Sequence, residues 1–213
     1  MKNIPGFTLV ELLVATMLTA FLGVSLVTIY STANRHVFQN YRGNTIKSDV
    51  SLAMRAIRNV MAQANSIYEP ASGNTGARLL VASNMDQMTN CRPSNLIVPK
   101  WHLFCTDTSG TNIRLFYHSG NIASTCWCPG PCAAPSIPVV TCSAGFQLAQ
   151  FLDTTDVFSR SSTLSHVPSG DLMSLRVQLR SVWTPSGGYA AVQRPVDHRL
   201  TTIFSVSRSS AGN

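Results

Sequence analysis

The sequence predicts an α+β fold in which one long N-terminal helix packs on an antiparallel β-sheet. Three observations support this prediction. An apolar run covers residues 7–30, an amphipathic pattern of helical period continues through residues 31–69, and alternating apolar and polar residues recur after Pro70. A helical segment followed by strand segments, rather than alternating with them, is typical of α+β domains.

A short polar leader precedes the apolar run. The chain begins MKNIPG and continues FTLVELLVATMLTAFLGVSLVTIY, a stretch of 24 residues whose single charge is Glu11. As a helix this stretch would span about 36 Å, enough to cross the hydrocarbon core of a bilayer. It is longer than the apolar region of a secretory signal, and no A-x-A-like cleavage site follows it. It therefore predicts a retained membrane-spanning helix.

The junction between leader and apolar run resembles the class III prepilin signal of type IV pilins and type II secretion pseudopilins. The matching residues are Gly6, Phe7, Thr8, Leu9, Glu11 and Leu12, followed by the spanning helix. The resemblance implies that a prepilin peptidase cuts after Gly6 and that the new N-terminus, Phe7, is N-methylated. Residues 1–6 would be the leader peptide, and residues 7–30 would first anchor the chain in a bacterial inner membrane and later form a filament core.

Glu11 is the unusual residue of the apolar run, because a charged side chain inside a bilayer is costly. It lies near one end of the run, which lowers that cost. The resemblance implies that Glu11 docks the subunit by pairing with the N-terminal amine of Phe7 in a neighbouring subunit. The alternative is a glutamate that reaches the lipid headgroups and has no further role. No second titratable group lies close along the helix, so a catalytic role is not expected.

Residues 31–69 predict an amphipathic continuation of the helix. Its apolar stripe consists of Val50, Ala53, Met54, Ile57, Val60, Met61, Ala64, Ile67 and Tyr68. This spacing is typical of a helix that packs on a core. Gly43 predicts a weak point or kink, and Pro70 ends the helix. No proline interrupts the apolar run, whereas many major pilins have one there, so the resemblance favours a minor pilin.

Residues 70–213 predict an antiparallel β-domain, which the resemblance places in the periplasm. Residues 173–179 alternate strictly between apolar and polar, as in a half-buried strand. Further strands are expected at residues 79–82, 113–117, 189–193 and 200–206. The ending, SLRVQLRSVW followed by DHRLTTIFSVSRSS, is similar to that of PilW-type minor pilins, with GspJ-type pseudopilins as the alternative.

The six cysteines predict disulfides and hence an oxidising compartment. They are Cys91, Cys105, Cys126, Cys128, Cys132 and Cys142. Prolines in residues 119–145 predict a long surface loop that disulfides staple. Of the fifteen pairings that six cysteines allow, those joining Cys126 to Cys128 are disfavoured, because so short a loop strains the bond. Zinc bound through His102, Cys105, Cys126 and Cys128 is the alternative, but clean C-x-x-C pairs are absent, and no metal is expected.

Composition and motifs narrow the function. The net charge of +7 is spread thinly, without a run of five like charges, so the charge allows DNA as a partner but no motif indicates it. GxSxG, HExxH and P-loop motifs are absent, and neither an enzyme nor a cofactor is expected.

These observations predict a PilW-like minor pilin that helps to prime or cap a type IV pilus. Its expected partners are other minor pilins, the major pilin and the prepilin peptidase. Its expected location is the inner membrane, with the C-terminal domain in the periplasm, and then the pilus at the cell surface. The third hypothesis is a membrane-anchored exported protein with a binding or catalytic domain.

Overall fold

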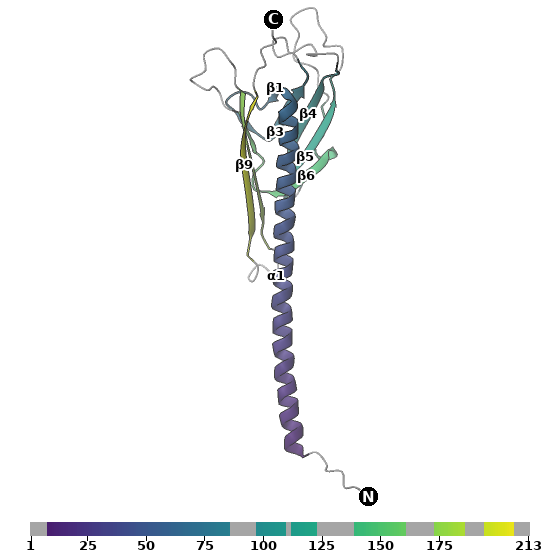
Figure 1. The fold of residues 1–213 in the computed structure, drawn as a ribbon, viewed down its shortest axis with the longest axis vertical. Coiled ribbons are helices and arrows are strands. Elements are labelled where there is room, and N and C mark those ends of the chain that lie inside the picture. The colour runs from purple at the N-terminus through teal and green to yellow at the C-terminus, as the bar shows by residue number, and fades with distance from the viewer. Residues whose placement is uncertain are drawn as a thin grey trace, which may run out of the picture.

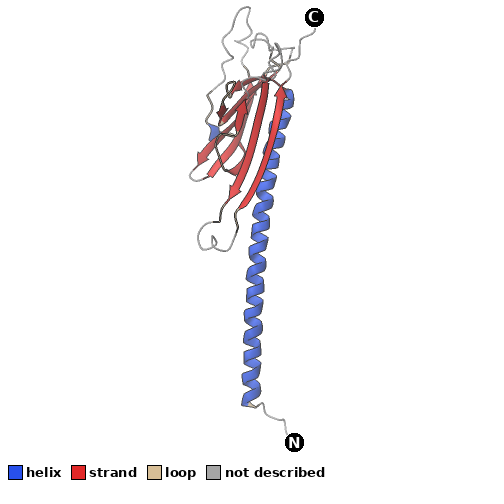
Figure 2. Ribbon diagram, turned by 90° about the vertical axis from the view of Figure 1, so that its left-hand side faces the viewer, coloured by secondary structure: helices blue, strands red, loops and turns tan. Residues whose placement is uncertain are grey.

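The computed structural model combines one long helix with a β-sheet that lies against the C-terminal part of that helix (Figures 1 and 2). The residues it describes are 8–85, 97–109, 112–122, 139–160, 173–185 and 194–206. The helix, α1 (Leu9–Gln63), extends far beyond the sheet toward the N-terminus. The α+β arrangement predicted from the sequence is confirmed.

One face of α1 packs on the sheet. Its buried residues are Ile46, Val50, Ala53, Met54, Ile57 and Met61, which confirms the helical part of the predicted stripe. The helix shows no break at Gly43, where a kink was predicted. Gly43 instead faces the sheet, where a Cβ would make ordinary van der Waals contact with Cγ1 of Val196 at 3.6 Å.

The helix ends at Gln63, earlier than the predicted end at residue 69. Ala64 already has extended backbone angles, and Ala64–Glu69 form strand β1. A contact from a distant part of the chain accompanies this change. The side chain of Asn65 accepts a hydrogen bond from the backbone N–H of Met85 at 3.1 Å and donates one to the Met85 carbonyl oxygen. Tertiary contact thus overrides the helical pattern at these residues.

The described residues form a nine-stranded sheet in which every pair is antiparallel. Its strands are β1 (Ala64–Glu69), β2 (Thr75–Gly76), β3 (Arg78–Ser83), β4 (Lys100–Ser109), β5 (Asn112–Asn121), β6 (Phe146–Leu152), β7 (Phe158–Arg160), β8 (Met173–Trp183) and β9 (Val196–Val206). Their order is β1-β3-β4-β5-β6-β8-β7-β2, and β9 pairs with β8 as well. Because β6 and β7 share one edge of β8, β9 occupies the other edge.

Four of the predicted strands are confirmed: residues 79–82 lie in β3, 113–117 in β5, 173–179 in β8 and 200–206 in β9. From Leu175 to Leu179 the predicted alternation is confirmed, since Leu175, Val177 and Leu179 are fully buried while Arg176 is exposed. The return strand predicted at residues 189–193 falls outside the described residues.

The sheet carries an apolar core on each face. The first core lies between α1 and the sheet and includes Ile57, Phe104 and Phe158. The second lies on the opposite face of β3, β4 and β5, where Leu103 and Cys105 flank Phe104 of the first core.

The second core changes the interpretation of the predicted cysteine-rich loop. Residues 119–121 belong to β5 rather than to a loop, and Val140 and Cys142 pack against the second core. Residues 123–138, the centre of the predicted loop, lie outside the described residues.

Candidate functional site at the start of the helix

The first turn of α1 is closed by a capping box. The backbone N–H of Glu11 donates to Oγ1 of Thr8 at 3.3 Å. In return, the backbone N–H and the hydroxyl of Thr8 both donate to Oε2 of Glu11, each at 2.9 Å. This arrangement gives a partner to two backbone N–H groups and to the Thr8 hydroxyl, and it fixes where α1 begins.

The capping box leaves Glu11 with bonding capacity. All three bonds use Oε2 or the backbone of Glu11, and Oε1 has no partner among the described residues. The partial positive charge of a helix N-terminus favours a carboxylate at this position. The carboxylate can therefore accept a further hydrogen bond or pair with a cation. Gly6 and Phe7, the predicted cleavage and N-methylation residues, lie outside the described residues.

Most of α1 before the sheet is a bare apolar rod. Its apolar window has a mean hydropathy of 2.3, and none of that window is buried within the chain. The exposed large apolar side chains are Leu9, Val10, Leu12, Leu13, Val14, Met17, Leu18, Phe21, Leu22, Val24, Leu26, Val27 and Ile29. By length and composition this helix can cross a membrane, so it is compatible with a single-pass anchor.

The hydroxyl groups of this rod are satisfied within the helix. Thr16, Thr19, Ser25 and Thr28 each donate to a backbone carbonyl three or four residues earlier, at 2.7–2.9 Å. A hydroxyl paired in this way needs no water. Apart from Glu11, the rod therefore presents lipid or another helix with a surface whose polar groups are already bonded.

The sequence did not predict the contact that joins the end of β8 to α1. The guanidinium of Arg42 lies over the ring of Trp183 at 4.5 Å, a cation–π contact between α1 and the end of β8. Nearby, Val37, Phe38 and Tyr41 are exposed on α1 and extend its apolar surface beyond the predicted span. Their i, i+1, i+4 spacing is the sequence signal that could have identified this extension.

One disulfide is present among the described residues. It joins Cys105 in β4 to Cys142 in the short 3-10 helix η2 (Cys142–Ala144), with Cα atoms 5.9 Å apart. The predicted use of cysteines as staples is confirmed for this pair. The other candidates, Cys91, Cys126, Cys128 and Cys132, lie outside the described residues.

This disulfide excludes Cys105 as the zinc ligand that was weighed as an alternative. One proposed co-ligand, His102, has Nδ1 at 2.8 Å from the hydroxyl of Tyr117. The other two, Cys126 and Cys128, lie outside the described residues. Burial lowers the pKa of His102, and the positive charge of Lys100 lowers it further. Within the described parts of the chain, no three His, Cys, Asp or Glu side chains are grouped so that they could hold a metal ion.

The carboxylate next to a histidine in the sequence, Asp197 beside His198, is paired with an arginine. Arg180 contacts Asp197 at 2.6 Å and Asp153 at 3.0 Å on the outer surface of the sheet. The hydrogen bond from Arg180 lowers the pKa of Asp197. Asp197 therefore serves as an acceptor for Arg180 in this structure.

Comparisons with protein-family models, with curated proteins and with solved structures find no match to this chain. The function must therefore be inferred from the chain's own residues. Those that bear on it most directly are the bare half of α1 and the carboxylate in its first turn.

Proposed function

We propose that the chain is a PilW-like minor pilin that takes part in the priming or tip complex of a type IV pilus. The observation that supports this most directly is the division of α1 into two parts. A bare apolar half, with Glu11 in its first turn, continues without a break into a half that the sheet covers. Such a helix can anchor a subunit in a membrane and can later pack among the helices of other subunits.

The capping box explains how Glu11 could serve in docking without a change of conformation. Oε2 is held by Thr8, so the position of the carboxylate is set before any partner arrives. Cleavage after Gly6 would place an ammonium group on Phe7. In a bundle of helices, the ammonium of one subunit would pair with Oε1 of Glu11 in the next, since a buried carboxylate requires a partner.

A GspJ-like subunit of a type II secretion pseudopilus would use the same first turn and the same anchor. The ending of the chain favours the PilW-like assignment. The two functions differ in where the subunit is found: a minor pilin enters filaments that can be sheared from the cell surface, whereas loss of a pseudopilin blocks secretion of folded proteins.

Two substitutions of Glu11 test the docking role, each expressed at native level. Both Glu11→Gln and Glu11→Val remove the charge, but glutamine at this position preserves the capping box and valine does not. We expect normal membrane content and at least a hundredfold less subunit in sheared filaments for both variants, because breaking a buried ion pair leaves a charge without its partner.

The control is Thr16→Val, which removes a polar group from the same helix but no docking group; it should enter filaments at the wild-type level. If Glu11→Gln also enters at the wild-type level while Glu11→Val does not, Glu11 is a helix cap and the docking role is wrong. The intact mass of the membrane-bound protein reports separately whether cleavage after Gly6 has occurred.

A further inference from the structure

Strand β9 has one paired and one unpaired edge. It pairs with β8 along all 11 of its residues without a shift in register. No described strand pairs with its other edge. Figure 1 shows β9 at the margin of the sheet, beside α1. Unpaired backbone N–H and C=O groups along such an edge can hydrogen-bond to a strand from another chain.

The C-terminal part of this edge lacks the charged residues, proline and bulge that usually prevent pairing between sheets. Native edge strands are commonly protected by lysine, proline or a bulge. Residues 200–206, LTTIFSV, contain no charge, proline or glycine, and are rich in β-branched and aromatic residues that favour strands. Ile203 is 68% exposed there. The edge is thus suited to pairing with a further strand.

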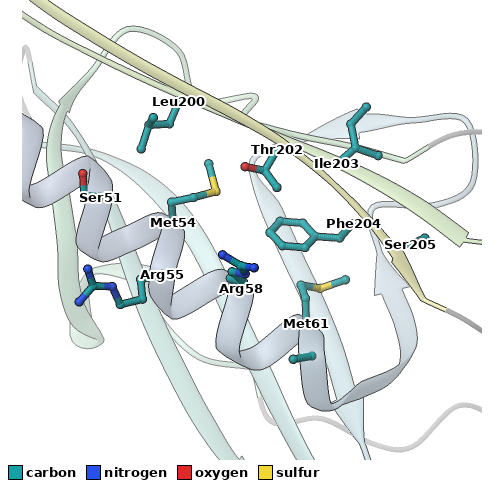
Figure 3. A pocket seen from close by; sticks show the side chains of 11 residues that line it. Ser51, Met54, Arg55, Arg58, Met61, Leu200, Thr202, Ile203, Phe204 and Ser205 are labelled. Carbon is teal, nitrogen blue, oxygen red and sulfur yellow. The ribbon is translucent and has the colours of Figure 1, made fainter.

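A groove of about 670 Å³ lies between this edge and α1 (Figure 3). Met54 and Met61 from the helix and Phe204 from β9 give it an apolar lining. Arg55 and Arg58 lie on the helix side, and neither forms an ion pair among the described residues. No acidic residue lines the groove. Its chemistry therefore favours acidic side chains, whose carboxylates can reach the arginines and whose methylene groups can contact the apolar lining.

We propose that the open edge of β9 binds an extended, acidic segment of a partner protein, which joins the sheet as an additional strand. Alternate side chains of that strand would face the groove and place carboxylates near Arg55 and Arg58. This inference goes beyond the function proposed above and does not depend on it. The chain's own residues 207–213, SRSSAGN, are poorly matched to the groove, since their one charged side chain is Arg208 and they include no large apolar residue.

The test uses the full chain in detergent and three fluorescein-labelled heptapeptides, with binding followed by fluorescence anisotropy. TVEVEVT should bind with a Kd below about 1 mM. TVKVKVT, which has the same strand propensity and opposite charge, should bind at least tenfold more weakly. TVEVEVT with alternate backbone nitrogens methylated should also lose at least tenfold, because strand addition requires those N–H groups.

Substitutions inside and outside the groove test whether the peptide binds there. Arg58→Glu should weaken TVEVEVT binding at least tenfold and strengthen TVKVKVT binding. Arg35→Glu makes the same charge change on an exposed part of the same helix outside the groove and should leave both affinities unchanged. Ile203→Lys should weaken both peptides, since a lysine on an edge strand opposes pairing.

Three results would overturn the proposal: no binding of TVEVEVT by the full chain, equal binding of its N-methylated form, or equal effects of Arg58→Glu and Arg35→Glu. If TVEVEVT bound only to a variant that ends at Val206, residues 207–213 would be what occupies the edge in the full chain, and a partner strand would be excluded.

Discussion

The disulfide between Cys105 and Cys142 leads to a quantitative prediction. The two cysteines are 37 residues apart in the sequence. Cross-linking a loop of that length removes about 13 cal/mol/K of entropy from the unfolded chain, which stabilises the folded state by about 4 kcal/mol at 25 °C. The double substitution Cys105→Ala with Cys142→Ala should therefore lower the free energy of unfolding by about that amount. Alanine is chosen because Cys105 is buried, and a serine hydroxyl there would need a hydrogen-bond partner.

The assay is guanidinium unfolding of the oxidised protein in detergent, followed by tryptophan fluorescence. For a domain of this size, about 4 kcal/mol corresponds to a midpoint lower by roughly 1 M. Ser143→Ala is the matched control, because it alters η2 without touching the bond and should leave the midpoint unchanged. Alkylation of non-reduced, exported wild-type protein should label none of the six cysteines. A midpoint shift below about 0.3 M in the double variant would show that the cross-link does not constrain the unfolded chain as argued.

Three further predictions concern processing, pH and the attachment of the sheet to the helix. Replacing Gly6 with a bulky residue should leave the full-length precursor in the membrane, and an N-terminus at Phe7 in that variant would contradict the prepilin assignment. Burial lowers the pKa of His102 below its unfolded value near 6.5, so the unfolded state binds the proton more readily. The stability of the fold should therefore be full above that pH and fall below it. In thermal unfolding, His102→Gln should show a flatter dependence of stability on pH between about pH 7 and pH 5. Arg42→Gln removes the cation–π contact with Trp183 and should cost about 0.5–1 kcal/mol, with faster amide hydrogen exchange at the paired ends of β8 and β9 and no change in β4.

Elements with one buried face could be predicted from the sequence. The stripe on α1 and the alternation in β8 arise because each element has a buried and an exposed side, so periodicity reports burial directly. Strand β4 was missed for the opposite reason. Leu103 and Phe104 are adjacent and both are buried, one in each core of the sheet, so the strand shows no alternation.

Features that depend on contacts between distant residues could not be predicted. The end of α1 coincides with the bonds from Asn65 to Met85, 20 residues away. From the sequence, any of the other cysteines could pair with Cys105. The structure shows that β4 and η2 lie side by side, which brings Cys142 to it. For the candidate site, the sequence and its resemblance identified Glu11, and the T-x-x-E spacing of Thr8 and Glu11 is the signal that could have indicated the capping box. Which carboxylate oxygen the box holds and which it leaves open is seen only in the structure.

If the chain is a pilin as proposed, the free energy of burying the apolar side chains of α1 limits how the subunit could move from the membrane into a filament. Burying one large apolar side chain contributes about 1.5–3 kcal/mol, so the 13 exposed between Leu9 and Ile29 represent roughly 20–40 kcal/mol. That exceeds the 5–15 kcal/mol that typically separates folded from unfolded domains. A charged side chain even at the centre of a bilayer costs only about 2.5–3.5 kcal/mol, so one carboxylate near the end of the run does not prevent insertion. The anchor therefore cannot pass through water as a free species. The subunit can leave lipid only as other apolar helices replace it. Among the described residues of this surface, the carboxylate of Glu11 is the charged group that could select which helix does so and in which register.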